Sequence, residues 1–320
     1  MNLDPVRARC FLEVVERGTV AAAAGALGYS PPAVSQQIAK LERSVGVALF
    51  DRMSGRLRPT PAARALVPHV YAVLDALEAG RRAARSAATG DREPVRVAAF
   101  PSAVVTLVAP AARRRRFPLG LIREAEDDVG LRELALGHVE VALVQEHNHQ
   151  VPERDPRLAY HRLMHDPLDL VVPEGWSLPT RLADTADLPW VVSSEGSPCW
   201  RSTLDAWADA GIAPAVAGQG IELTTLLALV AGGVGVALVP RLGIPTPAAG
   251  VVVAPGASPV VRTVYAVTRR THGQGAVADA VATLQDVAAD VAARETGRWR
   301  RGDEVSDGSG PAEFRAPDWP

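Results

Sequence analysis

The chain has 320 residues, of which 48% are hydrophobic and 22% charged, and this composition excludes a disordered protein and gives room for two or three compact units. No apolar run is long enough to span a membrane, and the first residues predict a capped helix and not a basic-then-apolar leader, so we expect a cytoplasmic protein without a membrane partner. The formal net charge of −2 is uneven: residues 1–93 carry 13 basic and 9 acidic side chains, a balance that favours a nucleic-acid-binding head on an acidic body.

The first three predicted helices have clear start and stop signals. Asp4 is a suitable N-cap for the first helix, and Gly18 ends it. Thr19 caps a second helix, which stops at Gly28 because glycine tolerates positive φ. Ser30 caps a third helix and is followed by proline in the first turn, where a missing N–H costs nothing.

The third helix has one apolar and one polar face. Its apolar residues recur at helical spacing: Val34, Ile38, Leu41 and Val45. The opposite face presents hydrogen-bonding side chains with little apolar bulk: Ser35, Gln36, Lys40 and Arg43. Two short helices joined by a tight glycine turn, the second with a polar face, predict a helix-turn-helix. The alternative is an ordinary pair of surface helices.

The segment Val47–Arg58 predicts a two-stranded ribbon that turns at Gly55. Such a ribbon would lay Arg52, Arg56 and Arg58 beside a DNA backbone or a narrow minor groove. The alternative is a solvated basic loop.

Residues Pro31–Leu66 resemble the winged helix-turn-helix of the LysR-type transcriptional regulators. The matching motifs are Ala33-Val34-Ser35, Leu41-Glu42, Gly46, Leu49-Phe50-Asp51-Arg52 and Thr60-Pro61-Ala62. The chain departs from the family at Pro59 and Ala63, where leucine and glycine are usual. The resemblance implies a regulator that binds an interrupted palindromic operator in double-stranded DNA and responds to a small-molecule effector. It also implies a homodimer or a dimer of dimers, with RNA polymerase as a further partner.

Within this head we expect Ser35 and Gln36 to read base edges. Lys40, Arg52 and Arg56 should hold phosphates. Pro32 and Ala33 can contact thymine methyl groups. The predicted DNA-binding residues are Ser30, Pro32, Ala33, Ser35, Gln36, Gln37, Lys40, Arg52 and Arg56.

The segment Pro61–Ala88 predicts a long helix with a heptad seam. The seam consists of Leu66, Val70, Val73, Leu77 and Ala84. In the family this helix pairs with its twin in an antiparallel dimer. Ala87–Glu93 is the predicted hinge.

From Pro94 onward, predicted strands alternate with predicted helices. The strands are Val95–Phe100, Leu119–Glu126, Val139–Gln145, Leu168–Val172, Trp190–Ser194 and Val264–Val267. The helices are Ala103–Arg116, Val129–Leu136, Cys199–Ala210, Leu223–Ala231 and Gly275–Ala293. Successive βαβ units predict a parallel sheet. The passage Gly232–Pro240 matches the family's effector domain, and it follows a helix, so it is no phosphate loop.

The predicted fold class is therefore α+β multidomain: a winged helix-turn-helix, a long linker helix and an α/β two-lobed effector domain like periplasmic binding proteins. The expected boundaries are 1–60 for the DNA-binding domain, 61–93 for the linker helix and hinge, and 94–296 for the effector domain. Residues 297–320 are polar and rich in helix breakers, which predicts a disordered tail.

Ligands of two-lobed α/β domains sit in the cleft beyond the carboxyl ends of strands. The residues predicted to line it are Ser102, Asp128, Gln145, Ser193, Ser194 and Gly196. The resemblance implies that Ser102 and Ser193–Gly196 border the inducer cavity. Helix capping is the alternative role for Ser102 and Asp128. Glu146 would instead favour a cationic ligand, so the sign of the ligand's charge stays open.

Histidines 147, 149, 161 and 165 raise the possibility of a metal site. Only His161 and His165 have the spacing of a helical ligand pair, and Pro167 disfavours a long helix there, so surface or capping roles are favoured. Cys199 follows Pro198 at a helix start, which could lower its pKa. The family's peroxide sensors use two cysteines in the effector domain, and this chain has one, which disfavours disulfide sensing.

The sequence predicts no catalytic residues, no metal and no cofactor, hence no enzyme. The competing interpretation is a cytoplasmic two-lobed small-molecule-binding protein, or an enzyme, with an accessory DNA-binding head.

Overall fold

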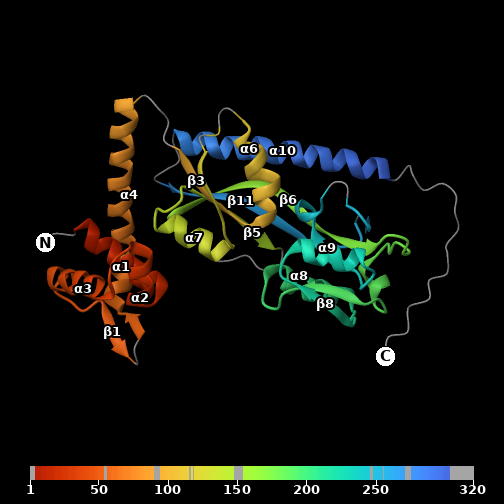
Figure 1. Ribbon diagram of the computed structural model, residues 1–320, viewed down its shortest axis with the longest axis horizontal. Coiled ribbons are helices and arrows are strands. Elements are labelled where there is room, and N and C mark those ends of the chain that lie inside the picture. Colours follow the sequence, from red (N-terminus) through yellow and green to blue (C-terminus); the bar gives the residue numbers. More distant parts are fainter. Residues whose placement is uncertain are drawn as a thin grey trace.

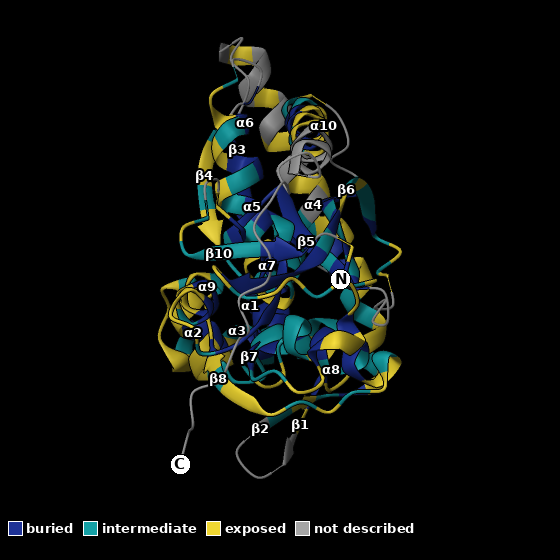
Figure 2. Cartoon of the chain, turned by 90° about the vertical axis from the view of Figure 1, so that its right-hand side faces the viewer, coloured by how far each residue is buried: buried dark blue, intermediate teal, exposed yellow. Residues whose placement is uncertain are grey.

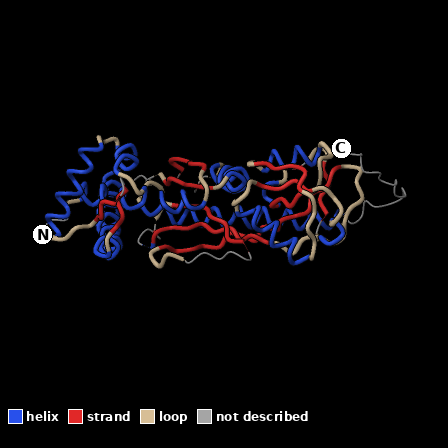
Figure 3. The backbone as a smooth tube through the Cα atoms, turned by 90° about the horizontal axis from the view of Figure 1, so that it is seen from below, coloured by secondary structure: helices blue, strands red, loops and turns tan. Residues whose placement is uncertain are grey.

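The computed structural model describes residues 4–53, 56–89, 94–114, 117, 119–147, 154–245, 248–254, 256–270 and 275–302. The molecule is elongated, with a helical head at one end and two strand-containing lobes beyond it (Figure 1). Seen from below, the strands of the two lobes follow one another along the long axis (Figure 3). This is the multidomain α+β arrangement expected from the sequence.

Three helices form the core of the head: α1 (Pro5–Arg17), α2 (Val20–Leu27) and α3 (Pro31–Val45). Each begins at its predicted cap, because the side chains of Asp4, Thr19 and Ser30 accept hydrogen bonds from N–H groups of the first turn. α2 ends at Gly28, whose φ of 68° is strained for other residues, so the tight turn into α3 depends on glycine. The main core side chains are Ala8, Phe11, Leu12, Val34, Ile38 and Leu41.

The wing is an antiparallel hairpin of β1 (Phe50–Met53) and β2 (Arg56–Pro59). Glu42 of α3 fixes its beginning, because one carboxylate oxygen accepts from two backbone N–H groups there, at 2.8 and 3.3 Å. Thr60 fixes its end, where the hydroxyl donates to the Ala48 carbonyl at 3.0 Å. Glu42 therefore joins the start of the wing to α3, and Thr60 closes the base of the hairpin.

The linker helix α4 (Pro61–Thr89) has nearly the predicted length, but its predicted seam divides into two parts. Val70 is fully buried and Leu66 packs beside it in the core of the same head. Val73 and Leu77 are 36% and 50% exposed. Only the distal part of the seam is open to a partner, because the proximal part covers α1.

Lobe 1 is built on the parallel strands β3 (Val95–Ala99), β4 (Leu119–Glu124) and β5 (Val141–His147), with β11 (Val261–Arg269) antiparallel to β5. Alternate strand residues point to opposite faces of the sheet. One set packs with α10 (Ala276–Gly302) and the other with α7 (Asp127–Ala135). Strand β5 in the middle of the sheet is dark blue in Figure 2, which marks it as buried, whereas β4 at the edge is intermediate to exposed.

Strand β6 (Leu158–Pro173) connects the lobes. Its first part pairs with β11, and its second part pairs with β9 (Ala237–Pro240) and β10 (Val251–Ala254) of lobe 2. The remaining elements of lobe 2 are the parallel pair β7 (Trp190–Ser193) and β8 (Val216–Gly220) and the helices α8 (Pro198–Ala210) and α9 (Leu223–Ala231).

The glycine-rich passage between α9 and β9 has a packing role. A Cβ at Gly235 would lie 2.4 Å from the carbonyl oxygen of Pro189, so only glycine lets the two backbones approach this closely. The parallel pairing of Trp190 with Val236 depends on this approach.

The structure corrects several sequence-based predictions. The sheet is mixed, because β11, β6, β9 and β10 pair antiparallel to their neighbours. Strands β8 and β10 and the first part of β6 were not predicted. The helix expected to start at Ala103 starts at Pro101 and contains a π-helical turn, Val104–Val108. α10 extends to Gly302, so residues 297–302 are helical and not a disordered tail. Residues 303–320 of that prediction, and 90–93 of the hinge, lie outside the described residues.

Candidate DNA-binding surface and effector cleft

The recognition helix α3 presents its predicted polar face to solvent. Ser35 and Gln36 are exposed, whereas Val34 and Ile38 on the opposite side are buried in the core. The other predicted contacts on or beside this helix are Ser30 and Pro32, which are exposed, and Ala33, Gln37 and Lys40, which are half-buried at the edges. The exposed face offers a hydroxyl and a carboxamide, groups that can hydrogen-bond base edges in a major groove.

The wing carries basic residues on both of its strands. Arg52 is opposite Leu57, and Arg56 is opposite Met53, so both belong to the half of the hairpin near its turn. Arg58, on β2 with Arg56, is exposed. The predicted turn at Gly55 lies outside the described residues.

A cavity of about 840 Å³ lies between the two lobes. Three of the predicted effector residues line it: Ser102 and Gln145 from lobe 1 and Ser193 from lobe 2. The first turn of α8 contributes Pro198 and Cys199. This volume and two-lobed lining are typical of sites for small organic molecules.

Arg262 of β11 organises the lobe 1 wall of the cavity, and sequence reasoning missed it. The side chain is 2% exposed and pairs with Asp166 at 2.7 Å. The same guanidinium donates to the Ser102 hydroxyl at 2.9 Å and to the Gln145 carboxamide oxygen at 2.5 Å, and it lies over the ring of Phe100. Ser102 is therefore not an N-cap: its hydroxyl oxygen accepts from this arginine, which orients the side chain and leaves the hydroxyl proton to donate elsewhere. Burial raises the pKa of Asp166, while Arg262 opposes that shift.

Carboxylates from both lobes also face the cavity. Glu126 is the N-cap residue of α7, and Glu222 is the N-cap residue of α9. Burial raises the pKa of Glu126, and the charges of Asp128 and Glu222 add to the shift. Behind them, burial raises the pKa of Asp127 to about 7. The cavity wall thus combines a buried guanidinium with the Glu126 carboxyl group, whose pKa is raised by burial.

Asp128 does not take the predicted place. The N-cap of α7 is Glu126, two residues earlier, so the prediction of Asp128 as a helix cap was wrong. Its side chain is 75% exposed and lies 3.7 Å from Arg132, outside the cavity lining.

The other strand-end predictions also fall outside the lining. Ser194 and Gly196 form the turn before α8, where the Ser194 hydroxyl donates to a backbone carbonyl of β8 at 3.4 Å. Glu146 is held by Arg154 at 2.8 and 3.1 Å, so it does not offer a free carboxylate to a cationic ligand.

The histidines take structural positions. His161 and His165 lie on β6, not on a helix, and face threonine hydroxyls of β11. His147 Nδ1 is 2.7 Å from the Ser202 hydroxyl, and burial lowers its pKa to about 4. His149 lies outside the described residues. Among the residues that the structure describes, no group of three or more His, Cys, Asp or Glu side chains is arranged to hold a metal ion.

The cysteines are free thiols. Cys10 is buried in the head. Burial raises the pKa of Cys199, which reverses the lowering that its place at a helix start suggested. None of the helices in the described ranges has both the length and the apolar character of a membrane span.

Comparisons with known proteins agree with this architecture. The family model described as "Bacterial regulatory helix-turn-helix protein, lysR family" matches residues 6–64, and "LysR substrate binding domain" matches residues 88–289. The probable hydrogen peroxide-inducible genes activator of Mycobacterium avium is 31% identical, covering 75% of this chain and 78% of that protein. The regulator IlvR of Caulobacter vibrioides is 30% identical, covering 74% of this chain and 82% of that protein.

Solved structures share the fold. Full-length OxyR from Pseudomonas aeruginosa has a TM-score of 0.64 at 20% identity, covering 90% of this chain and 95% of that one. ArgP from Mycobacterium tuberculosis has a TM-score of 0.60 at 21% identity, covering 90% and 98%. The family models and the relatives are of transcriptional regulators, not enzymes. The chain therefore belongs to the LysR family of transcriptional regulators.

Proposed function

We propose that this regulator binds an interrupted palindromic operator through α3 and the wing, and that a small-molecule effector in the cavity between the lobes controls it. The observation that carries the proposal is the exposed face of Ser35 and Gln36 on a helix whose other side is fully buried. Lys40 and the wing arginines act as phosphate contacts. The cavity residues Ser102, Gln145 and Ser193 act as effector contacts.

We expect Gln36→Ala to weaken specific operator binding by about 1–3 kcal/mol while leaving non-specific binding nearly unchanged, because the carboxamide reads a base edge. Lys40→Ala is the comparison, since the loss of a phosphate contact should weaken binding to all DNA sequences and lower the salt dependence of the affinity by about one unit of slope. Titration of fluorescent DNA from upstream of the protein's own gene, at several salt concentrations, measures both. An operator affinity unchanged in Gln36→Ala would contradict the assignment of α3 as the reading helix.

We further propose a homodimer that forms along the distal part of α4, with a dimer of dimers as the larger assembly. The far end of α4 extends beyond the head (Figure 1), and Val73 and Leu77, on the part that passes α1, are exposed. Large apolar side chains at helical spacing on an uncovered helix favour pairing with a second copy.

Leu77→Glu should place an unpaired carboxylate in that pairing and shift the protein to monomer, with operator affinity falling about tenfold or more because the two half-sites are no longer bound together. Ala72→Glu, at an exposed position on another side of the same helix, is the matched control. Sedimentation velocity measures the change. A dimer that survives Leu77→Glu would mean that a different surface holds the protomers.

The peroxide response in the names of the mycobacterial relatives is not part of the function that we propose for this chain. Thiol sensing requires a thiolate, and burial raises the pKa of Cys199, the only cysteine of the effector domain. RNA polymerase stays a proposed partner from the family resemblance alone.

A further inference from the structure

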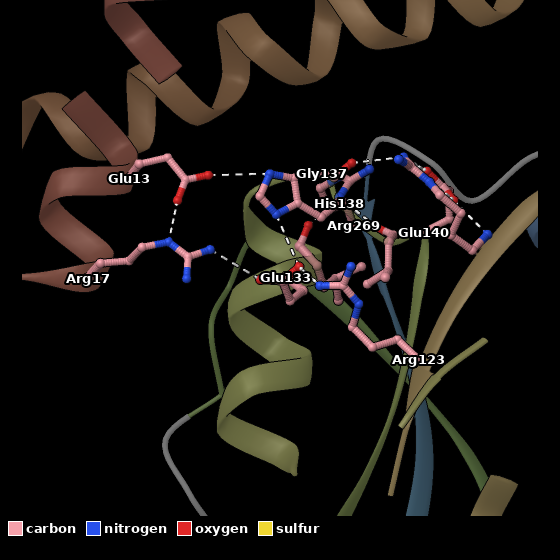
Figure 4. Close-up of polar contacts among 11 residues, drawn as sticks. Glu13, Arg17, Arg123, Glu133, Gly137, His138, Glu140 and Arg269 are labelled. Carbon is pink, nitrogen blue, oxygen red and sulfur yellow. Dashed lines mark hydrogen bonds and ion pairs between the residues drawn. The ribbon is translucent and has the colours of Figure 1, made fainter. Parts of the chain in front are cut away.

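The head and lobe 1 meet through charged side chains between α1 and the end of α7 (Figure 4). Arg17 of α1 pairs with Glu13 on its own helix at 2.6 Å and with Glu133 of α7 at 3.4 Å. His138 lies between the two carboxylates, with Nε2 3.3 Å from Glu13 and Nδ1 3.1 Å from Glu133. Each carboxylate therefore has a partner from the head and a partner from lobe 1. We call these four residues the docking contact.

The two carboxylates of the docking contact are buried. The side chain of Glu13 is 0% exposed and that of Glu133 is 6% exposed. Burial favours the neutral form of Glu13, but hydrogen bonds from His138 and Arg17 outweigh it, and the pKa of Glu13 is lowered. A buried ionised carboxylate is stable only while its partners stay in place. The contact is therefore specific for this orientation of the two domains.

Two further contacts support the docking contact. Leu136, at the end of α7, is 6% exposed and belongs to the apolar cluster of the head. Arg157, held by Asp155, lies 4.2 Å from the ring centroid of Tyr71 on α4, and the Tyr71 hydroxyl donates to Glu16 at 2.7 Å. The interface thus joins two helices of the head to two segments of lobe 1.

Helix α7 extends from this interface to the effector cavity. Its N-cap, Glu126, lines the cavity, and its last turn carries Glu133. The nine-residue helix is about 13 Å long. It lies directly on the sheet, since a Cβ at Gly130 would be 3.6 Å from the Cβ of Ala98. A helix packed this closely transmits displacement as a rigid element.

We infer that the docking contact holds the DNA-binding head on lobe 1, so that the head, α7 and the sheet of lobe 1 form one body that reaches from α1 to the wall of the effector cavity. The interface combines these ion pairs with the apolar contact of Ala135 and Leu136 in the core of the head. The docking does not depend on which effector binds.

A double-mutant cycle in the full-length protein tests the docking. The variants are Glu13→Gln in the head, His138→Ala in lobe 1, and both together. Hydroxyl-radical labelling of Tyr71, which is 5% exposed, reports separation of the domains. We expect each single variant to raise labelling on the order of threefold to tenfold, and the double variant to add little more, because both substitutions break the same contact.

Asp128→Asn is the matched control, because it removes an acidic group from the same helix on an exposed side chain away from the head. It should label as the wild type does. Wild-type labelling in both single variants, with circular dichroism showing a folded protein, would overturn the inference. Labelling of the control raised as far as in the single variants would also overturn it. If Glu13→Gln does not fold, Arg17→Gln takes its place on the head side, with the same expected and contradicting outcomes.

Discussion

Arg262→Met should destabilise the effector domain by about 3–5 kcal/mol, because it leaves Asp166 fully buried without its cation. The substitution also removes the donors that hold Ser102 and Gln145 in the cavity wall. Urea unfolding followed by tryptophan fluorescence measures the loss, since Trp190 and Trp207 pack edge to face in the core of lobe 2.

Two comparisons separate charge burial from the simple loss of a side chain. Arg241→Met breaks a second ion pair, with Asp169, in which the arginine is 20% exposed, so its cost should be smaller. Asp166→Leu combined with Arg262→Met should recover much of the stability, because no charge is then left unpaired. A destabilisation that remains in the double variant would contradict this account.

Asp127→Asn should change how stability depends on pH. Burial raises the pKa of Asp127 from 3.8 to about 7, so the folded protein binds this proton more tightly than the unfolded chain. That contribution is complete below pH about 4 and is lost as the pH rises through 7. The variant has no such proton to lose. Between pH 5 and pH 8 the wild type should therefore lose on the order of 2–3 kcal/mol more unfolding free energy than the variant does.

Urea unfolding at the two pH values measures the difference. Asp128→Asn is the control, since its carboxylate is 75% exposed and should leave the pH dependence as in the wild type. Equal pH dependence in the wild type and Asp127→Asn would mean that Asp127 is ionised throughout.

The head was predictable because its signals are local. Asp4, Thr19 and Ser30 cap helices through N–H groups three or fewer residues away, so the spacing alone fixes where each helix begins. The predicted seam of the linker helix was only partly correct, because local spacing does not show which partner covers it. Helical spacing placed Val70 and Leu77 on one apolar face of α4. Which of the two is buried in the protein's own head depends on how α4 crosses α1.

The effector domain was less predictable because its decisive contacts are distant in sequence. Strand β6 carries Pro167 at the point where it leaves β11 for β9, and a proline with polar neighbours does not indicate a strand. The folded sheet brings Arg262 next to Ser102 and Gln145, which are more than 100 residues away in the sequence, so no local pattern indicated the arginine. The contact of Glu13 with His138 joins residues of different domains and has no local signal.

The central claim is that this chain recognises a specific DNA sequence through α3. Selection of genomic DNA fragments by the purified full-length protein at moderate salt, followed by sequencing, tests it most directly, with Gln36→Ala treated in parallel. We predict enrichment of a motif with two dyad-related half-sites in the wild type and loss of that enrichment in the variant. Recovery of fragments without a common motif, or of the same motif at the same enrichment from Gln36→Ala, would contradict the account.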